Sequence, residues 1–240
     1  MHAAGAFVLR ERRYSAAARE IALAAVAALT YFGVRNLTAG AADEAFSNAD
    51  RLARLEERMH VAWELPLQDA VLGHGSVSTF FNWIYIWGHW PVILTTAIVL
   101  YRLHPKRYVL FRNAMFLSGA IGFLLFALLP VAPPRLVDPS LIDTVTLHSD
   151  AYRALQPPGL TNQYAAFPSL HFGWNLLVGV AVWGATRNVP LRVLAILGPA
   201  AMGAAVVLTA NHYVLDVVGG TAVVLVALWV ACRGVGSTGR

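Results

Sequence analysis

Long apolar stretches separated by short polar ones run through most of this chain. The apolar stretches cover residues 21–34, 79–103, 109–129, 168–187, 193–209 and 212–232. Most of them approach the roughly 20 residues that a helix needs to cross a bilayer. The pattern predicts an all-α fold, an integral membrane bundle of about six transmembrane helices.

The segment 41–72 has a different pattern, because charged residues alternate with apolar ones. Its apolar positions Leu52, Leu55 and Met59 recur at spacings of three and four residues, which is the period of an amphipathic helix. We expect an interfacial helix that does not span the membrane and that Pro66 breaks. It would cover the access path of a lipid, although a solvated connector helix has the same pattern.

The second apolar stretch, 79–103, contains two unusual residues. Pro91 is expected to kink the helix. His89 lies close to it among several tryptophans. This histidine could line a polar cavity, or it could bond a backbone carbonyl in a structural role.

Composition agrees with a membrane protein. Only 13% of the 240 residues are charged and 58% are hydrophobic, whereas soluble domains average about 25% charged residues. We expect one membrane domain over 1–240, with an N-terminal segment at 1–20 and a membrane core at 80–232. A cleaved signal peptide would begin similarly, but no small-residue cleavage site follows closely, which favours an uncleaved first span.

Positive charge gathers on one side of the predicted bundle. The N-terminus, the 102–112 loop, the 187–192 loop and the C-terminus together hold 12 of the 18 Lys and Arg residues. The positive-inside rule makes that side cytoplasmic. We therefore expect a plasma membrane protein with both termini in the cytoplasm. The net charge of +5 follows from this topology and does not indicate a nucleic-acid partner.

Four polar residues fall at the opposite, extracytoplasmic ends of the spans, namely Arg135, His171, His212 and Asp216. His212 and Asp216 are four residues apart, so on a helix the carboxylate can hold the imidazole. Ionisable residues within a membrane span are costly and therefore indicate a functional site. A structural pair at the membrane surface is the alternative.

These side chains could form a metal site, an acyl-transfer triad or a phosphoryl-transfer site. A metal site is the weakest reading, because no H-x-x-x-H pair is present. Ser169 lacks the G-x-S-x-G context of a serine nucleophile. Phosphoryl transfer fits best, since a helix beginning at Pro168 offers its N-terminal N–H groups to a phosphate. Ser169 and Arg135 add hydrogen-bond donors to that end.

The candidate residues belong to three motifs, namely Ala132-Pro133-Pro134-Arg135, Ala165-Ala166-Phe167-Pro168-Ser169-Leu170-His171, and Asn211-His212-Tyr213-Val214-Leu215-Asp216 followed by Gly219. These motifs resemble those of the type 2 phosphatidic acid phosphatase superfamily, and within it the branch of inositol phosphorylceramide synthases. The resemblance implies a membrane lipid phosphotransferase or phosphatase that cleaves a lipid phosphoester.

The resemblance also implies a role for each residue of the site. His212 would attack phosphorus and form a phosphohistidine, while Asp216 orients it. His171 would protonate the leaving oxygen and then activate the acceptor. Arg135 would bind the phosphate and stabilise the transition state. No metal or other cofactor is implied.

The chain departs from the pattern of the soluble phosphatases at three positions. Leu170 stands where glycine is usual, Val206 where arginine is usual and Leu128 where lysine is usual. The phosphate charge must then be met by fewer cations. Backbone amides, Asn211 and Tyr213 are the expected additional phosphate-binding groups. These departures match the lipid phosphotransferase branch better than the phosphatidate phosphatases.

Several alternatives stay open. The phosphoryl group could pass to an alcohol such as inositol or to water, and the substrate could be a diacylglycerol phosphate, a prenyl phosphate or diphosphate, or a phosphoinositide. A lipid-binding or transport protein is the non-enzymatic alternative, although a transport pathway usually carries ionisable residues through the membrane depth. The loop 136–166 could be a lid over the phosphate, with Asn162, Gln163 and Tyr164 nearest to it, or an ordered connection.

Overall fold

The computed structural model describes residues 2–148 and 161–237, and all regular elements within these residues are helices. An isolated bridge between Val131 and Ala165 is the β pairing among them. The prediction of an all-α fold is therefore confirmed. A helix satisfies its backbone hydrogen bonds internally, which is what a bilayer requires of the segments that cross it.

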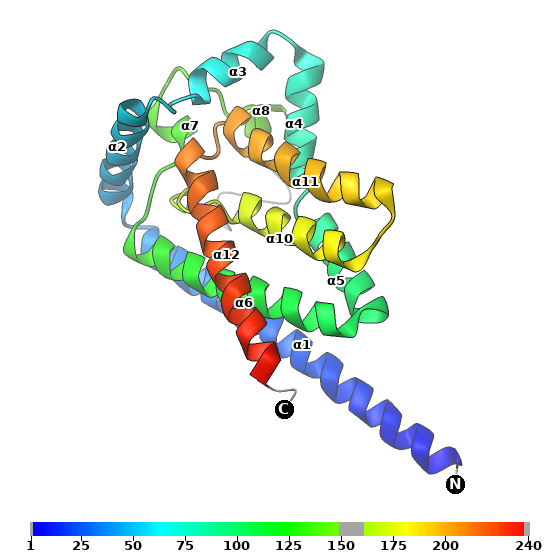
Figure 1. Ribbon diagram of the computed structural model, residues 1–240. Helices are drawn as coiled ribbons and strands as arrows, with labels where there is room; N and C mark the ends of the chain where they lie inside the picture. Colours follow the sequence, from blue (N-terminus) through cyan, green and yellow to red (C-terminus); the bar gives the residue numbers. More distant parts are fainter. Residues whose placement is uncertain (1, 149–160, 238–240) are drawn as a thin grey trace.

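The helices divide into a bundle and a group at one end of it (Figure 1). The bundle consists of α1 (His2–Thr38), α4 (Gly75–Trp87), α5 (Trp90–Leu103), α6 (Pro105–Leu128), α10 (Leu170–Ala185), α11 (Val189–Leu208) and α12 (Val214–Ser237). The end group consists of α2 (Ala42–Met59), α3 (Glu64–Leu72), α7 (Pro134–Val137) and α8 (Thr144–His148).

Several bundle helices have the length and composition of membrane spans. In the described residues, four segments pass this test: Ala18–Thr38, Pro105–Leu128, Val189–Leu208 and Val214–Gly234. The bent pair α4 and α5 adds a fifth if the two helices count as one crossing. The sixth predicted span is α10, whose 16 residues extend about 24 Å at 1.5 Å per residue. This protein is therefore an integral membrane bundle in which α10 is a short inner helix.

The second span is broken rather than kinked at its proline. α4 ends at Trp87 and α5 begins at Trp90, with an angle of 46° between the two helices. Pro91 lies in the first turn of α5, where a missing N–H removes no helical hydrogen bond. The expected kink at Pro91 is thus corrected to a break at Gly88 and His89. This break places a histidine at the interior of the bundle, where it is 4% exposed.

The segment 41–72 forms two helices instead of one. α2 ends where His60 adopts the left-handed conformation, with φ of 58°, and α3 begins at Glu64. The prediction that Pro66 breaks this segment is wrong, because Pro66 lies in the first turn of α3. The predicted apolar stripe is only partly buried: Leu55 and Met59 are exposed, while Leu52 packs against the cluster that includes the buried Ala45 and Ala49.

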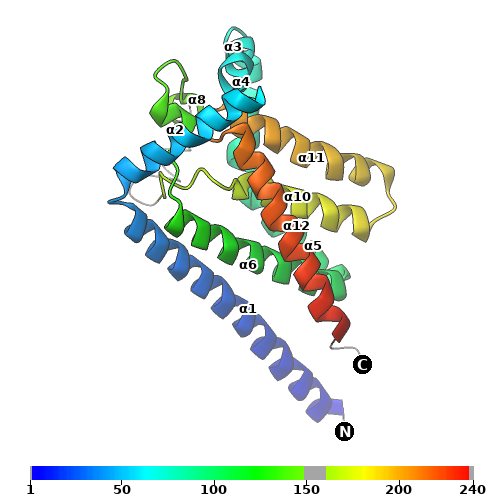
Figure 2. The same ribbon diagram turned by 60° about the vertical axis from the view of Figure 1, so that its left-hand side comes forward.

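Close packing of glycines brings the N-terminal ends of α10 and α12 together. α12 crosses α6 and α10, and α11 lies along α10 (Figures 1 and 2). A Cβ at Gly173 would lie 2.9 Å from the carbonyl oxygen of Gly220, and a Cβ at Gly220 would collide with the carbonyl of Ser169. Glycine at both positions therefore lets α10 and α12 approach at their N-terminal ends.

Candidate active site

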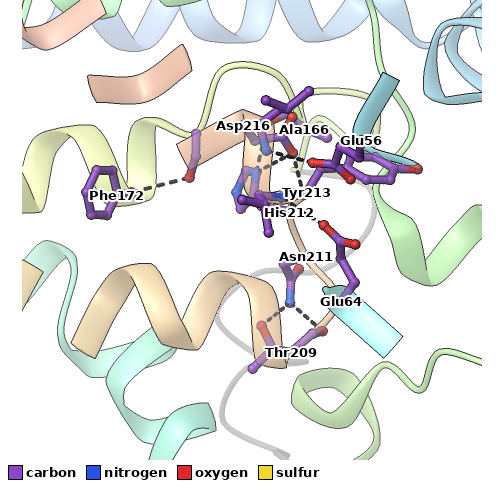
Figure 3. A network of polar contacts seen from close by, with 12 residues as sticks. Glu56, Glu64, Ala166, Phe172, Thr209, Asn211, His212, Tyr213 and Asp216 are labelled. Atoms are coloured by element: carbon purple, nitrogen blue, oxygen red, sulfur yellow. Dashed lines mark hydrogen bonds and ion pairs between the residues drawn. The ribbon is translucent and has the colours of Figure 1, made fainter. Parts of the chain in front are cut away.

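The turn that precedes α12 holds the predicted histidine and carboxylate. The helix begins at Val214 rather than at His212 as predicted, so His212 lies just before it and Asp216 in its first turn. The Oδ2 atom of Asp216 is 3.3 Å from Nδ1 of His212 and accepts a hydrogen bond of 2.8 Å from the N–H of Tyr213 (Figure 3). One carboxylate oxygen thus fixes both the imidazole and the backbone beside it.

The second partner of His212 determines where its ring proton sits. Nδ1 of His212 is also 2.8 Å from the carbonyl oxygen of Ala166, a residue of the second motif. A carbonyl and a carboxylate can only accept hydrogen bonds, so Nδ1 must carry the proton. The other ring nitrogen, Nε2, then keeps a lone pair, as a nucleophile or a base requires.

The second histidine faces the first across the junction of α10 and α12. The ring centroids of His171 and His212 are 6.0 Å apart. The N–H of Ser169 donates to the carbonyl of Asp216 at 2.9 Å, which ties the start of α10 to the turn before α12. On its other side, His171 stacks on Tyr85 of α4 at 4.8 Å. The structure therefore brings His171, His212 and Asp216 together from two motifs.

The N-terminus of α10 begins later than predicted. Pro168 follows a cis peptide bond from Phe167 and lies outside the helix, and the helix starts at Leu170 with Ser169 as its N-cap. The hydroxyl oxygen of Ser169 accepts a hydrogen bond of 3.3 Å from the N–H of Phe172. The N–H groups of Leu170 and His171 have no acceptor within the helix, so they are suited to an anion.

The predicted arginine pairs with a carboxylate and lies close to the start of the third motif. Nε of Arg135 is 3.1 Å from Oδ2 of Asp143, and its side chain is 16% exposed. Its backbone N–H donates to the carbonyl of Ala210, just before the third motif, and its guanidinium lies within electrostatic range of His171. Because the guanidinium has five N–H donors, the contact with Asp143 leaves others for a phosphate.

Two other predicted phosphate-binding residues have contacts that support the turn. The side-chain amide of Asn211 donates to the carbonyl and the hydroxyl of Thr209, at 3.2 and 2.9 Å. The ring of Tyr213 packs against Ala45 and Ala49 of α2. Burial, and then Asp216, raise the pKa of the Tyr213 hydroxyl, so it stays neutral. The structure joins neither side chain to His171.

Two buried glutamates complete the turn, and the sequence analysis missed both. Oε1 of Glu64 accepts from the N–H of Val214 at 2.8 Å, and Oε1 of Glu56 accepts from the N–H of Leu215 at 2.7 Å (Figure 3). Burial, and then the neighbouring Glu64, raise the pKa of Glu56 to about 9. Charged residues of an amphipathic segment are normally solvated, so nothing in the sequence distinguished these two glutamates from their exposed neighbours.

The predicted lid is described only in part, since 149–160 lie outside the described residues. At its end, the side-chain oxygen of Asn162 accepts from the hydroxyl of Thr38 and from the N–H of Tyr164, both at 3.1 Å. The N–H of Asn162 donates to the hydroxyl of Tyr31. These contacts tie the segment that leads into the second motif to the end of α1, and a lid over the phosphate stays a prediction.

Comparison with known families identifies this arrangement. A family model described as PAP2 superfamily matches residues 50–230. The chain belongs to the PAP2 superfamily. Membership supports phosphatase or phosphotransferase activity on phosphorylated lipids. No protein of curated function and no solved structure matches the chain.

The PAP2 match extends beyond the spans that carry the three motifs. It begins at residue 50, so it includes Glu56 and Glu64 as well as both histidines. The end group of helices is therefore part of the region shared with the PAP2 superfamily.

Proposed function

We propose that this protein cleaves a lipid phosphoester through a phosphohistidine formed at His212. The observation that carries the proposal is the position of Nδ1 of His212 between the Ala166 carbonyl and the Asp216 carboxylate, with His171 6.0 Å away. This arrangement supplies an unprotonated Nε2 as the nucleophile, a carboxylate that orients it and a second imidazole for proton transfer.

The reaction then has two steps. Nε2 of His212 attacks phosphorus, so that a P–N bond forms as the P–O bond to the lipid breaks, and His171 gives its proton to the leaving oxygen. In the second step His171 takes the proton of an acceptor hydroxyl, whose oxygen attacks phosphorus and breaks the P–N bond. Asp216 stabilises the positive charge that the imidazole of His212 carries in between.

The phosphate is proposed to bind at the start of α10. The N–H groups of Leu170 and His171 lie at the positive end of the helix dipole. The oxygen of the Ser169 hydroxyl accepts from Phe172, and its O–H can still donate to a phosphate. Arg135 supplies the charged donors. Such preorganised donors stabilise the charge that develops on the phosphoryl oxygens, and we expect no metal or other cofactor to be needed.

The acceptor is proposed to be an alcohol head group such as inositol, or water. The first step is the same for both, so the group held beside His171 decides the product. The donor is a phospholipid or a prenyl phosphate, whose apolar tail would pack against the membrane spans.

The site is proposed to open on the extracytoplasmic face of the plasma membrane. Arg107 near the start of α6 and Arg192 near the start of α11 belong to the basic side of the predicted topology, whereas the site lies at the other ends of these helices. The exposed apolar residues Leu55, Met59 and Trp63 of the end group would rest in the lipid interface.

Labelling of the enzyme tests the proposal. Purified wild type and His212→Ala are incubated in detergent with chelator and with lipid phosphates labelled on phosphorus, with and without inositol. We expect wild type alone to form an acid-labile, base-stable phosphoenzyme, and inositol to collect the label if it is the acceptor. A His212→Ala protein that turns over these lipids at the wild-type rate would refute the nucleophile.

A further inference from the structure

A third histidine lies directly behind the proposed general acid. His89 occupies the break between α4 and α5 and is 4% exposed. Its ring centroid is 4.2 Å from that of His171, with 31° between the ring planes. Tyr85 stacks on His171 at 4.8 Å and 15°. The imidazole of His171 is therefore in contact with two aromatic rings that both come from the broken span.

An asparagine links the two histidines. The side-chain nitrogen of Asn175 donates to the backbone carbonyl of His171 at 2.9 Å and lies 3.3 Å from Nδ1 of His89. The ring of His89 also stacks on Trp174 at 5.8 Å and 5°. His89 is thus held by a polar contact and by rings, so it forms a fixed wall behind His171.

The break in the span is what makes this contact possible. An interrupted helix within a membrane loses backbone hydrogen bonds, and such interruptions are tolerated where the backbone lies inside the protein. The break at His89 occurs in that kind of place, because the histidine, Asn175 and Trp174 are all buried. The buried imidazole contributes to none of the proposed chemical steps, so its contact with His171 needs an explanation of its own.

We propose that His89 is a positioning residue, which with Asn175 holds the imidazole of His171 in the orientation that protonates the leaving oxygen. This inference rests on the proposed function, in which His171 is the general acid. Other ionisable groups near His171 are Tyr85 of α4, which stacks on it, His212 before α12, and Arg135 of α7. His89 differs from the last two because it lies on the side of His171 that faces α4 and α5.

The test compares substrates whose leaving groups differ in basicity. An alkyl lipid phosphate releases an alkoxide that needs a proton, whereas p-nitrophenyl phosphate releases a phenolate that leaves without one. Since general acid catalysis contributes roughly 10²- to 10⁴-fold, His89→Ala should lower kcat/KM on the alkyl phosphate by about 10- to 100-fold. We compare kcat/KM because it reports formation of the phosphoenzyme, whereas kcat also includes the second step, in which His171 is the base for both substrates. On p-nitrophenyl phosphate the loss should stay below about threefold. His89→Phe keeps a ring behind His171 and should recover most of the difference.

Two controls accompany this comparison. His171→Ala should show the same preference for the aryl substrate, and adding His89→Ala to it should cause no further loss, because residues that act as a unit are not additive. His74→Ala changes an exposed histidine at the start of α4 whose side chain makes no cap, and it should leave both substrates unchanged.

Each outcome has a separate meaning. Equal losses on both substrates in His89→Ala and Asn175→Ala would indicate a purely structural role and overturn the inference, as would full activity in His89→Ala. A selective loss in His171→Ala without one in His89→Ala would refute only the positioning role. Equal losses on both substrates in His171→Ala would instead refute the acid assigned in the proposed function. If His89→Ala does not fold, Asn175→Ala carries the same comparison, with His89→Phe as its control.

Discussion

The N-terminal ends of α10 and α12 are neighbours, yet they are capped in opposite ways. At α12, three consecutive backbone N–H groups each donate to a buried carboxylate. At α10, the capping group is the neutral hydroxyl of Ser169, and the ionisable side chain in the first turn is His171. The two ends are joined by the hydrogen bond from the Ser169 N–H to the Asp216 carbonyl.

This difference separates two tasks that a phosphoryl-transfer site must perform. A helix N-terminus attracts anions, and the end of α12 is already occupied by carboxyl groups from its own chain. Its role is to fix the turn that carries His212. The end of α10 is capped by a neutral group and is the one suited to an external phosphate. The predictions below test this division, from the largest expected effect to the smallest.

The largest effect is expected at the carboxylate that serves both the nucleophile and the turn. Asp216→Asn removes the charge that stabilises the imidazolium of His212, and we expect kcat to fall on the order of 10⁴-fold, as for the carboxylate of a comparable triad. Steady-state turnover of a lipid phosphate measures this. Glu64→Gln is the matched control, because it changes the next carboxylate of the same cap without touching His212. Comparable losses in the two variants would contradict the special role of Asp216.

The arginine should come second. Arg135→Ala removes charged donors from the phosphate, and loss of one such donor typically costs about 10²-fold in kcat. Asp143→Asn keeps the arginine and removes its carboxylate partner at 3.1 Å, so it should preserve or improve phosphate binding. Kinetics on one lipid phosphate compare the two. A larger loss in Asp143→Asn than in Arg135→Ala would mean that the ion pair itself is what matters.

Giving α10 the kind of cap that α12 has should weaken phosphate binding. Aspartate is as good an N-cap as serine, so Ser169→Asp should keep the helix while its charge repels the substrate, raising KM about tenfold or more. Ser169→Ala should instead lower the stability of the protein by about 1 kcal/mol with a smaller change in KM. Unfolding curves and KM are measured for both variants. An unchanged KM in Ser169→Asp would place the phosphate elsewhere.

The smallest effect concerns the pH dependence of stability. The pKa of Glu56 is raised from 4.5 to about 9 by burial and by Glu64, so the folded protein keeps a proton that the unfolded chain releases. The stabilisation from this proton is fully present below pH 4.5 and is lost as the pH rises through about 9. Glu56→Gln mimics the protonated form and should make stability less dependent on pH in that window.

Thermal unfolding in detergent, followed by tryptophan fluorescence between pH 5 and about pH 9.5, measures this dependence. Glu57→Gln changes the adjacent, exposed glutamate of α2 and should behave as wild type. If Glu56→Gln and wild type lose stability in parallel as the pH rises, the buried carboxyl is not the group responsible.

The sequence alone determined the membrane bundle and the identity of the central residues. Apolar periodicity depends on local composition, so it identified all six segments, and the fixed spacing of His212 and Asp216 made their contact predictable. Local rules also misplaced several boundaries. Three prolines show this. Pro66 and Pro91 were expected to break and to kink helices, but each lies in the first turn of a helix. Pro168 was expected to begin a helix that starts at Leu170.

Only the tertiary structure decided which groups surround these residues. Glu56 and Glu64 are more than 140 positions from the N–H groups that they cap, and His89 is 82 positions from His171. No local pattern can pair such residues, because the pairing depends on how α2, α3 and the broken span pack on α10 and α12. The sequence thus determined which residues carry the predicted chemistry, while packing decided that one helix end is filled with carboxyl groups and the other is capped by a neutral hydroxyl.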